Sequence, residues 1–255
     1  MKIRAVRKFG LIGYPLSHSF SQRYFTEKFR REKIVDARYE NYPIASVEEL
    51  PELITSVKDL AGLNVTIPYK EKVIPYLDEL SGDAAQVKAV NTIRIIREND
   101  RMHLVGYNTD TWGFEETLRP LLRPWHTFAL VLGTGGAAKA VGYVLKRMGM
   151  EVWYLSRRPR GEKTIRYEEL TGPMLQQIKL LVNTTPLGMF PDTGRCPDIP
   201  YHYLTDEHLL YDLIYNPEET LFMKKGKERG ATVVNGLAML EQQAERAWEI
   251  WNDER

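Results

Sequence analysis

The stretch from residue 128 to residue 155 constrains the fold of this chain more than any other part. An apolar run, FALVL, leads into the glycine turn GTGG, and a helical stretch then leads into a second apolar run, EVWYL. Within that helical stretch, apolar residues recur at helical spacing from Ala137 to Met148. Two strands joined by a helix run parallel in one sheet. This stretch therefore predicts a βαβ unit and a parallel sheet.

Further apolar runs place this unit within a larger domain. KLLVNTTPLG, LLYDLIYN and ATVVNG follow as buried-strand candidates, so residues 111–236 predict one domain of strands spaced by helices. Residues 1–110 alternate strand-like and helical stretches of their own and end in a β-hairpin. The tail, 237–255, is an amphipathic helix that we expect to pack back on the first domain. The predicted fold class is α/β with two domains.

The composition is that of an ordinary globular chain. Its 255 residues are 43% hydrophobic and 27% charged, with a formal net charge of +1. This balance gives no reason to expect a nucleic acid or an anionic membrane as a partner, and no apolar run approaches the ~20 residues of a membrane span. Cys196 is the only cysteine, and we see no signal-peptide pattern, so we expect a cytoplasmic protein. The histidines and Cys196 lack metal-ligand spacing, so we predict no metal.

The glycine turn also matches the fingerprint G-x-G-x-x-G/A, between the strand and the helix that a dinucleotide site requires. Small residues let the backbone approach a pyrophosphate, and the N-terminus of a helix favours its negative charge. The alternative is a turn that only packs a helix on a strand. The candidate cofactor residues are Gly133, Thr134, Gly135, Gly136, Ala137 and Ala138.

The residues after EVWYL indicate which dinucleotide binds. An NAD site usually carries an acidic residue here for the ribose 2′-hydroxyl, whereas this chain has Ser156, Arg157 and Arg158. Guanidinium groups bind a 2′-phosphate, and a carboxylate would repel it. We therefore predict NADP rather than NAD, with a solvated basic loop as the alternative.

The segment NVTIPYK, at 64–70, predicts a second candidate site. Apolar and polar residues alternate as in a strand, but Pro68 cannot donate to a sheet ladder, so the strand must end there or lie at an edge. Ligands in α/β sheets usually bind at strand ends. Asn64, Thr66 and Lys70 are the polar side chains at this point.

Eight motifs, in order along almost the whole chain, resemble shikimate dehydrogenase. They are GYPLSHSFS, GLNVTIPYK, AVNTI, GYNTDTWG, GTGGAAKA, VNTTPLGM, YDLIYNP and NGLAMLEQQA. The resemblance implies an N-terminal α/β substrate-binding domain (1–110, closed by helix 237–255), a Rossmann NADP-binding domain (111–236), and an active-site cleft between them. It also implies that the protein works as a monomer or homodimer on a small-molecule substrate.

The resemblance also implies roles for individual residues. Lys70 and Asp110 match the catalytic pair. The implied substrate-binding residues are Ser19, Ser21, Asn64, Thr66, Lys70, Asn91, Asp110, Tyr215 and Gln243. Thr184 and Met189 match the loop on the nicotinamide side, and Gly236 is implied to approach the nicotinamide. His18, between the two serines, has no expected proton-transfer role.

The implied reaction is the NADP-dependent, reversible reduction of 3-dehydroshikimate to shikimate in aromatic amino-acid biosynthesis. NADPH supplies a hydride to the carbonyl carbon, and the oxygen then needs a proton. A lysine ammonium can donate that proton and stabilise the developing charge, so Lys70 suits this role, with Asp110 to orient its amine. In the reverse direction Lys70 must start neutral, so alcohol oxidation should be faster at alkaline pH. Hydroxyl and amide side chains suit a hydroxyl-rich substrate because they both donate and accept.

Three positions depart from the family pattern, and three other functions remain open. Phe20 stands where the family often has Lys, Gln22 where it often has Pro, and Arg158 where Thr is common. The alternatives are a quinate/shikimate dehydrogenase that uses NAD, a non-catalytic NADP-binding protein of the same fold, and another Rossmann oxidoreductase such as a methylene-tetrahydrofolate dehydrogenase. The two serines favour shikimate, the arginines favour NADP, and Lys70 with Asp110 favours an enzyme.

Overall fold

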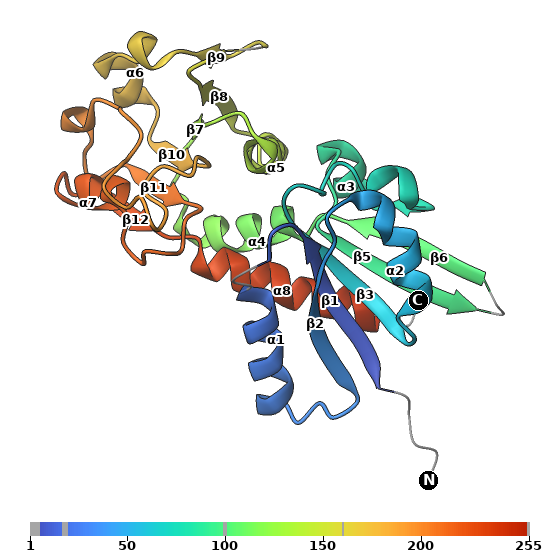
Figure 1. Cartoon of the computed structure of the whole chain (residues 1–255). Helices are drawn as coiled ribbons and strands as arrows, with labels where there is room; N and C mark the ends of the chain where they lie inside the picture. Colours follow the sequence, from blue (N-terminus) through green and yellow to red (C-terminus); the bar gives the residue numbers. More distant parts are fainter. Residues whose placement is uncertain (1–5, 17–19, 99–100, 160, 254–255) are drawn as a thin grey trace. The chain divides into compact units, whose positions relative to one another are not determined.

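The computed structural model describes residues 6–16, 20–98, 101–159 and 161–253 (Figure 1). The chain forms two compact units. The first unit consists of Met1–Thr109 and Gln243–Arg255, and the second unit consists of Asp110–Gln242. None of the helices in the described part of the chain is both long and apolar enough to cross a membrane.

The first unit contains a mixed sheet of six strands in the order β2-β1-β3-β5-β6-β4. Strand β1 is parallel to both β2 and β3, whereas β5 is antiparallel to both β3 and β6. The antiparallel pair β5 and β6 is the hairpin that the sequence predicts. The strands are β1 (Arg7–Gly13), β2 (Ala37–Pro43), β3 (Leu60–Val65), β4 (Glu79–Leu80), β5 (Thr92–Glu98) and β6 (Arg101–Tyr107).

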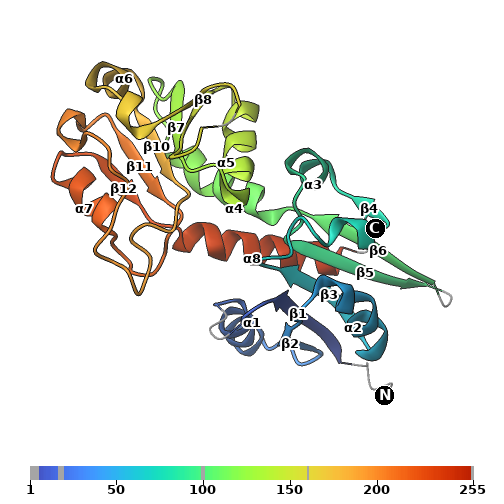
Figure 2. The same cartoon turned by 45° about the horizontal axis from the view of Figure 1, so that its top comes forward.

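Helices cover both faces of the first sheet. Strands β1 to β3 lie between α1 (Phe20–Arg31) and α2 (Leu50–Ser56) in Figure 2. One core cluster joins the sheet to α2 and contains Ile12, Leu50, Ile54 and Leu63. The other joins it to α1 and to the C-terminal helix α8 (Leu237–Asn252), and contains Phe9, Phe25, Ala244 and Trp251. From Gln243 onward the C-terminal helix therefore belongs to the core of the first unit.

Short helices complete the first unit. The helix expected from SVEELPELITSVKD divides into η1 (Val47–Glu49) and α2, because Pro51 lies in the first turn of α2, where its missing N–H costs nothing. The Ser46 N–H donates to Glu49 Oε1 (2.8 Å), which is one half of the expected capping box. The remaining short helices are η2 (Ile74–Tyr76) and α3 (Gly82–Val87).

The second unit contains a fully parallel sheet of six strands in the order β12-β11-β10-β7-β8-β9. With β7 counted as strand 1 and the sheet read from the β9 edge, this order is 3-2-1-4-5-6, the order of doubly wound dinucleotide-binding sheets. The predicted parallel sheet is confirmed. The strands are β7 (Phe128–Leu132), β8 (Glu151–Leu155), β9 (Thr164–Ile165), β10 (Leu180–Asn183), β11 (Leu209–Asp212) and β12 (Thr232–Val234).

Two buried clusters lie on the two faces of the second sheet. Ala129, Val131 and Val182 pack with α5, while Leu130, Leu132 and Leu181 pack with α6 and α7. The period of two along the strands assigns alternate residues to opposite faces. The helices are α4 (Thr109–Leu118), η3 (Arg119–Leu121), α5 (Gly136–Arg147), η4 (Tyr167–Glu169), α6 (Gly172–Gln177), η5 (Tyr201–Tyr203) and α7 (Leu221–Lys227).

Candidate functional site

A buried hydrogen-bond network in the first unit contains three of the predicted substrate residues. Asn64, at the end of β3, accepts a hydrogen bond at Oδ1 from Tyr39 Oη (2.8 Å). Its Nδ2 donates to Thr92 Oγ1 (3.1 Å) and to the Asn91 carbonyl oxygen (3.3 Å). The Asn64 amide is therefore held in one orientation by groups from β2, from β5 and from the residue before β5.

Asn91 and Gln243 extend the network. Asn91 Oδ1 accepts from the Thr109 N–H (2.7 Å), and Asn91 Nδ2 donates to Gln243 Oε1 (3.4 Å). The Thr109 hydroxyl lies 3.2 Å from Asn91 Oδ1 and 3.3 Å from Gln243 Oε1. Asn64, Asn91 and Gln243 are thus brought together, although 152 positions separate the last two. Each of the three is less than 10% exposed.

The turn that carries Thr66 and Lys70 is tied to the same region by backbone hydrogen bonds. Strand β3 ends at Val65, as expected from the proline that follows. The Thr66 N–H donates to the carbonyl oxygen of Ile12 (2.9 Å), and the Val90 N–H donates to that of Lys70 (2.7 Å). The backbone of Lys70 is therefore bonded to the residue just before Asn91.

The structure gives only part of the surroundings of the remaining predicted residues. Ser21 lies in the first turn of α1 and hydrogen bonds with Tyr39. Burial raises the pKa of Tyr39, and this bond with Ser21 acts in the opposite direction. Asp110 follows Thr109 directly and lies in the first turn of α4, and its pairing with Lys70 stays a prediction. Ser19 and His18 lie outside the described residues.

The glycine turn of the second unit has the geometry of an anion site. Strand β7 ends at Leu132, and Gly133 has a φ of +110°, which favours glycine. Helix α5 begins at Gly136, and no side chain caps its N-terminus. A Cβ atom added at Gly135 or Gly136 would meet no heavy atom within 4 Å. The turn therefore leaves room beside N–H groups that favour a phosphate.

The two arginines lie next to this turn in the second unit. The Gly133 N–H donates to the carbonyl oxygen of Leu155, the last residue of β8, and Ser156 follows at once. Ser156 Oγ accepts from the Arg158 N–H (3.2 Å) and so fixes the backbone there. Arg157 and Arg158 are both exposed. A nucleotide with its pyrophosphate on α5 would have guanidinium groups available beyond the adjacent strand.

A second buried network lies at the ends of β10 and β11. Asp212 is fully buried and accepts from Asn183 Nδ2 (3.0 Å), the Ile214 N–H (3.1 Å) and Thr220 Oγ1 (2.7 Å). Asn183 Oδ1 accepts in turn from the N–H (3.1 Å) and the hydroxyl (2.7 Å) of Thr185. Burial raises the pKa of Asp212 to about 6, although these three hydrogen bonds oppose the shift.

This network supports the loops that carry the predicted nicotinamide-side residues. Thr184 Oγ1 donates to the Leu132 carbonyl oxygen (2.6 Å), and a Cβ at Gly133 would lie 2.8 Å from that hydroxyl. The Gly236 N–H donates to the carbonyl oxygen of Ile214 (3.0 Å). Met189 is 48% exposed and Tyr215 is 40% exposed, so both side chains are accessible on these loops.

Replacement of Asp212 by asparagine should change how stability depends on pH. The folded protein keeps the Asp212 proton to a higher pH than the unfolded chain, so this group stabilises the fold most below pH 4. Its contribution is lost as pH rises through about 6. We expect the unfolding free energy of Asp212→Asn, relative to wild type, to rise by about 2 kcal/mol between pH 4 and pH 7. Urea unfolding at both pH values measures this change.

Asp206→Asn is the control for this experiment, because Asp206 is an exposed acid of the same unit. Its unfolding free energy should follow that of the wild type at both pH values. If the unfolding free energies of Asp212→Asn and wild type differed by the same amount at both pH values, the pKa of Asp212 would not be raised in the folded protein.

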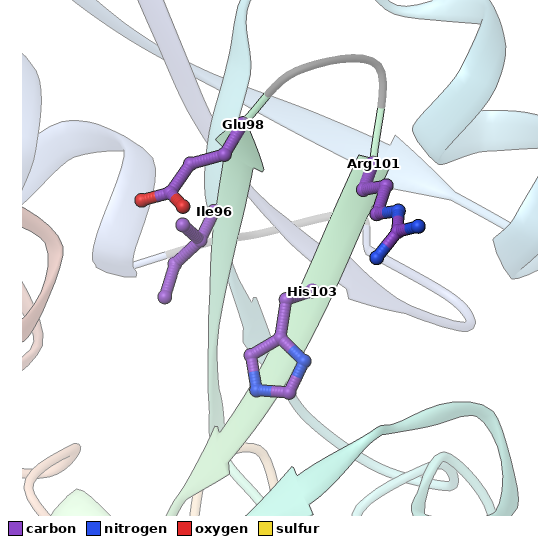
Figure 3. A pocket seen from close by; sticks show the side chains of 4 residues that line it. All are labelled: Ile96, Glu98, Arg101 and His103. Atoms are coloured by element: carbon purple, nitrogen blue, oxygen red, sulfur yellow. The ribbon is translucent and has the colours of Figure 1, made fainter.

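The first unit also has a surface hollow that is not part of the candidate site. A surface hollow of about 480 Å³ lies on the β5–β6 hairpin and is lined by Ile96, Glu98, Arg101 and His103, none of which the sequence marks (Figure 3). Within the described ranges, no group of three or more His, Cys, Asp or Glu side chains could hold a metal ion.

Both a part of the first unit and the chain as a whole are similar in sequence to known proteins. Residues 11–93 match a family model described as the shikimate dehydrogenase substrate binding domain. A Desulforamulus reducens protein named shikimate dehydrogenase (NADP(+)) is 37% identical in an alignment that covers 95% of this chain and 88% of that protein. The chain belongs to the shikimate dehydrogenase family. The resemblance seen in the eight motifs is thereby confirmed.

Solved structures agree with this membership. The shikimate 5-dehydrogenase of Thermus thermophilus, in complex with NADP(H) and shikimate, is 32% identical with a TM-score of 0.82, over 96% of this chain and 93% of that one. A 5-ketofructose reductase of Gluconobacter sp. strain CHM43 is 25% identical with a TM-score of 0.85, over 98% and 94%. The second likeness shows that the fold of the shikimate dehydrogenase family also carries another named activity, so the substrate must be argued from the site.

The sequence did not mark several residues that the structure places in the networks. Tyr39, Thr92 and Thr109 connect the predicted substrate residues, and Asn183, Asp212 and Thr220 support the loops of the second unit. Thr92, Thr109, Asn183 and Asp212 each stand within one of the eight motifs, so the motif itself was the available signal. Tyr39 and Thr220 had no such signal.

Proposed function

We propose that this protein catalyses the NADP-dependent, reversible reduction of 3-dehydroshikimate to shikimate. The observation that carries the proposal is the network of Asn64, Asn91 and Gln243 beside the turn that bears Lys70, in a chain of this family. Amide and hydroxyl groups suit a small substrate with several hydroxyls. The first unit, with the C-terminal helix, is the substrate-binding domain of this proposal, and the second unit is the NADP-binding domain.

Lys70 is the proton donor in the proposed mechanism. NADPH, when bound, supplies a hydride to the substrate carbonyl carbon. Lys70 Nζ then protonates the carbonyl oxygen and stabilises its developing negative charge, and Asp110 orients the amine. Asn64, Thr66, Asn91, Tyr215 and Gln243 hold the substrate, and Ser19 and Ser21 bind its carboxylate. Oxidation of shikimate reverses these steps.

The second unit fits NADP. The uncapped N-terminus of α5 and the open space above Gly135 and Gly136 suit the pyrophosphate. Arg157 and Arg158 suit the 2′-phosphate, with Ser156 fixing the turn. Thr184, Met189 and Gly236 line the nicotinamide side in this proposal. We further propose that the enzyme is cytoplasmic, in keeping with its single cysteine, and works as a monomer or homodimer.

Turnover with defined substrates tests the proposal. Purified protein with shikimate and NADP at alkaline pH should produce reduced nicotinamide, followed by absorbance. Parallel reactions contain quinate in place of shikimate, or NAD in place of NADP. Substantially faster turnover with quinate or NAD would favour the alternative of a quinate/shikimate dehydrogenase that uses NAD. Binding of NADP without turnover of either acid would indicate a nucleotide-binding protein of this fold with another role.

A further inference from the structure

A buried tyrosine hydroxyl lies between two of the proposed substrate-binding residues. Tyr39, on β2, is 5% exposed, and its ring stacks on Phe25 with centroids 4.6 Å apart and an interplanar angle of 15°. Tyr39 pairs with Phe9 of β1, and Asn64 of β3 pairs with Leu11 of the same strand. Because Phe9 and Leu11 are two residues apart, all four side chains share one face of the sheet. The tyrosine therefore reaches across β1.

The hydroxyl of Tyr39 has a partner on each side. It donates to Asn64 Oδ1 at 2.8 Å. It also hydrogen bonds with Ser21 of α1, and this bond lowers the tyrosine pKa against the effect of burial. The tyrosine has a single O–H, which it donates to Asn64, so the bond with Ser21 is donated by the serine hydroxyl to the tyrosine oxygen. The donors therefore run in one direction, from Ser21 through Tyr39 to Asn64, and on from Asn64 Nδ2 to Thr92.

This arrangement joins groups that the chain brings from three elements. Ser21 comes from helix α1, Tyr39 from β2 and Asn64 from β3. A serine hydroxyl rotates easily and an asparagine amide can turn over, so each loses conformational freedom when a ligand orders it. A fixed hydroxyl between them orders both groups before substrate arrives, which improves binding.

We propose that Tyr39 is a positioning residue for substrate binding, which holds Ser21 and Asn64 in one hydrogen-bonded arrangement. This inference rests on the proposed function. Tyr39 acts through these two side chains, while they contact shikimate. Its hydroxyl thereby links carboxylate binding at Ser21 to hydroxyl binding at Asn64.

Tyr39→Phe tests the proposal because it keeps the ring that stacks on Phe25 and removes only the hydroxyl. The KM for shikimate should rise about tenfold, the effect of one lost hydrogen bond. The kcat should stay within about twofold, and the KM for NADP should not change. Tyr42→Phe is the matched control, since Tyr42 lies on the same strand and its hydroxyl donates to Glu40 Oε2 (3.1 Å). Its KM for shikimate should stay within about twofold of wild type.

Ser21→Ala and the double variant then test whether Tyr39 acts through Ser21. In the Ser21→Ala background, Tyr39→Phe should raise the KM for shikimate about threefold rather than tenfold, because only the bond to Asn64 is then left to lose. The full tenfold effect in that background would overturn the proposal, as would equal KM values for Tyr39→Phe and Tyr42→Phe. Absence of shikimate turnover by the wild type would contradict the proposed function itself, whereas wild-type turnover with no effect of Tyr39→Phe contradicts the role of Tyr39 alone.

Discussion

Lys70→Ala is expected to lower the kcat for shikimate oxidation about 10³-fold. General acid–base catalysis by one side chain contributes about 10²- to 10⁴-fold, and stabilisation of the oxyanion adds to it. The alanine variant should still bind NADP with unchanged affinity, because Lys70 belongs to the first unit and the glycine turn to the second. Steady-state kinetics and titration of NADP by calorimetry measure the two quantities.

Lys72→Ala is the matched control, since Lys72 is an exposed lysine two residues away. Its kcat should stay within about twofold of wild type. Asp110→Asn should also lower the kcat, and the double variant Lys70→Ala, Asp110→Asn should be little slower than Lys70→Ala alone, because the two residues act as one unit. A Lys70→Ala variant with more than a tenth of the wild-type kcat would remove Lys70 from the mechanism.

Those parts of the fold that depend on local sequence could be predicted. The strand, glycine turn and helix at 128–148 are adjacent in the chain, and their periods and breakers are strong. The end of β3 before Pro68 follows from the missing N–H of that residue. By contrast, β4, β9, α6 and α7 have two to seven residues, too few for a period to distinguish them from loops.

The candidate site could be predicted only where a motif carried it. Asn64, Asn91 and Gln243 stand in motifs of the family, and the structure brings them together through Thr92 and Thr109. Tyr39 was missed because its position depends on strand order. A single sequence does not show that β1 pairs with both β2 and β3, and without that order nothing places the Tyr39 hydroxyl beside Asn64.

The roles of Arg157 and Arg158 lead to the second large expected effect. Replacement of both by alanine should raise the KM for NADP about 10²-fold and leave the KM for NAD within about threefold. Each guanidinium group makes charge-assisted hydrogen bonds to the 2′-phosphate, worth roughly 1.5 kcal/mol or more apiece, and NAD lacks that phosphate. Kinetics with each nucleotide at saturating shikimate measure the ratio of the KM for NADP to the KM for NAD.

Salt provides a second test of the same contacts. Added salt should weaken NADP binding to the wild type more than to the double variant, because both arginines are exposed.

Single variants separate the two arginines. Arg158 stands where the family commonly has Thr, so Arg158→Thr restores the family pattern and should raise the KM for NADP by less than about tenfold if Arg157 alone supplies most of the binding. A larger effect of Arg158→Thr than of Arg157→Ala would show that this chain uses its unusual arginine as the main phosphate contact. Arg229→Ala, at an exposed position after α7, is the control and should leave both KM values unchanged. Equal losses for NADP and NAD in the double variant would contradict recognition of the 2′-phosphate, because a distorted turn would weaken both nucleotides alike.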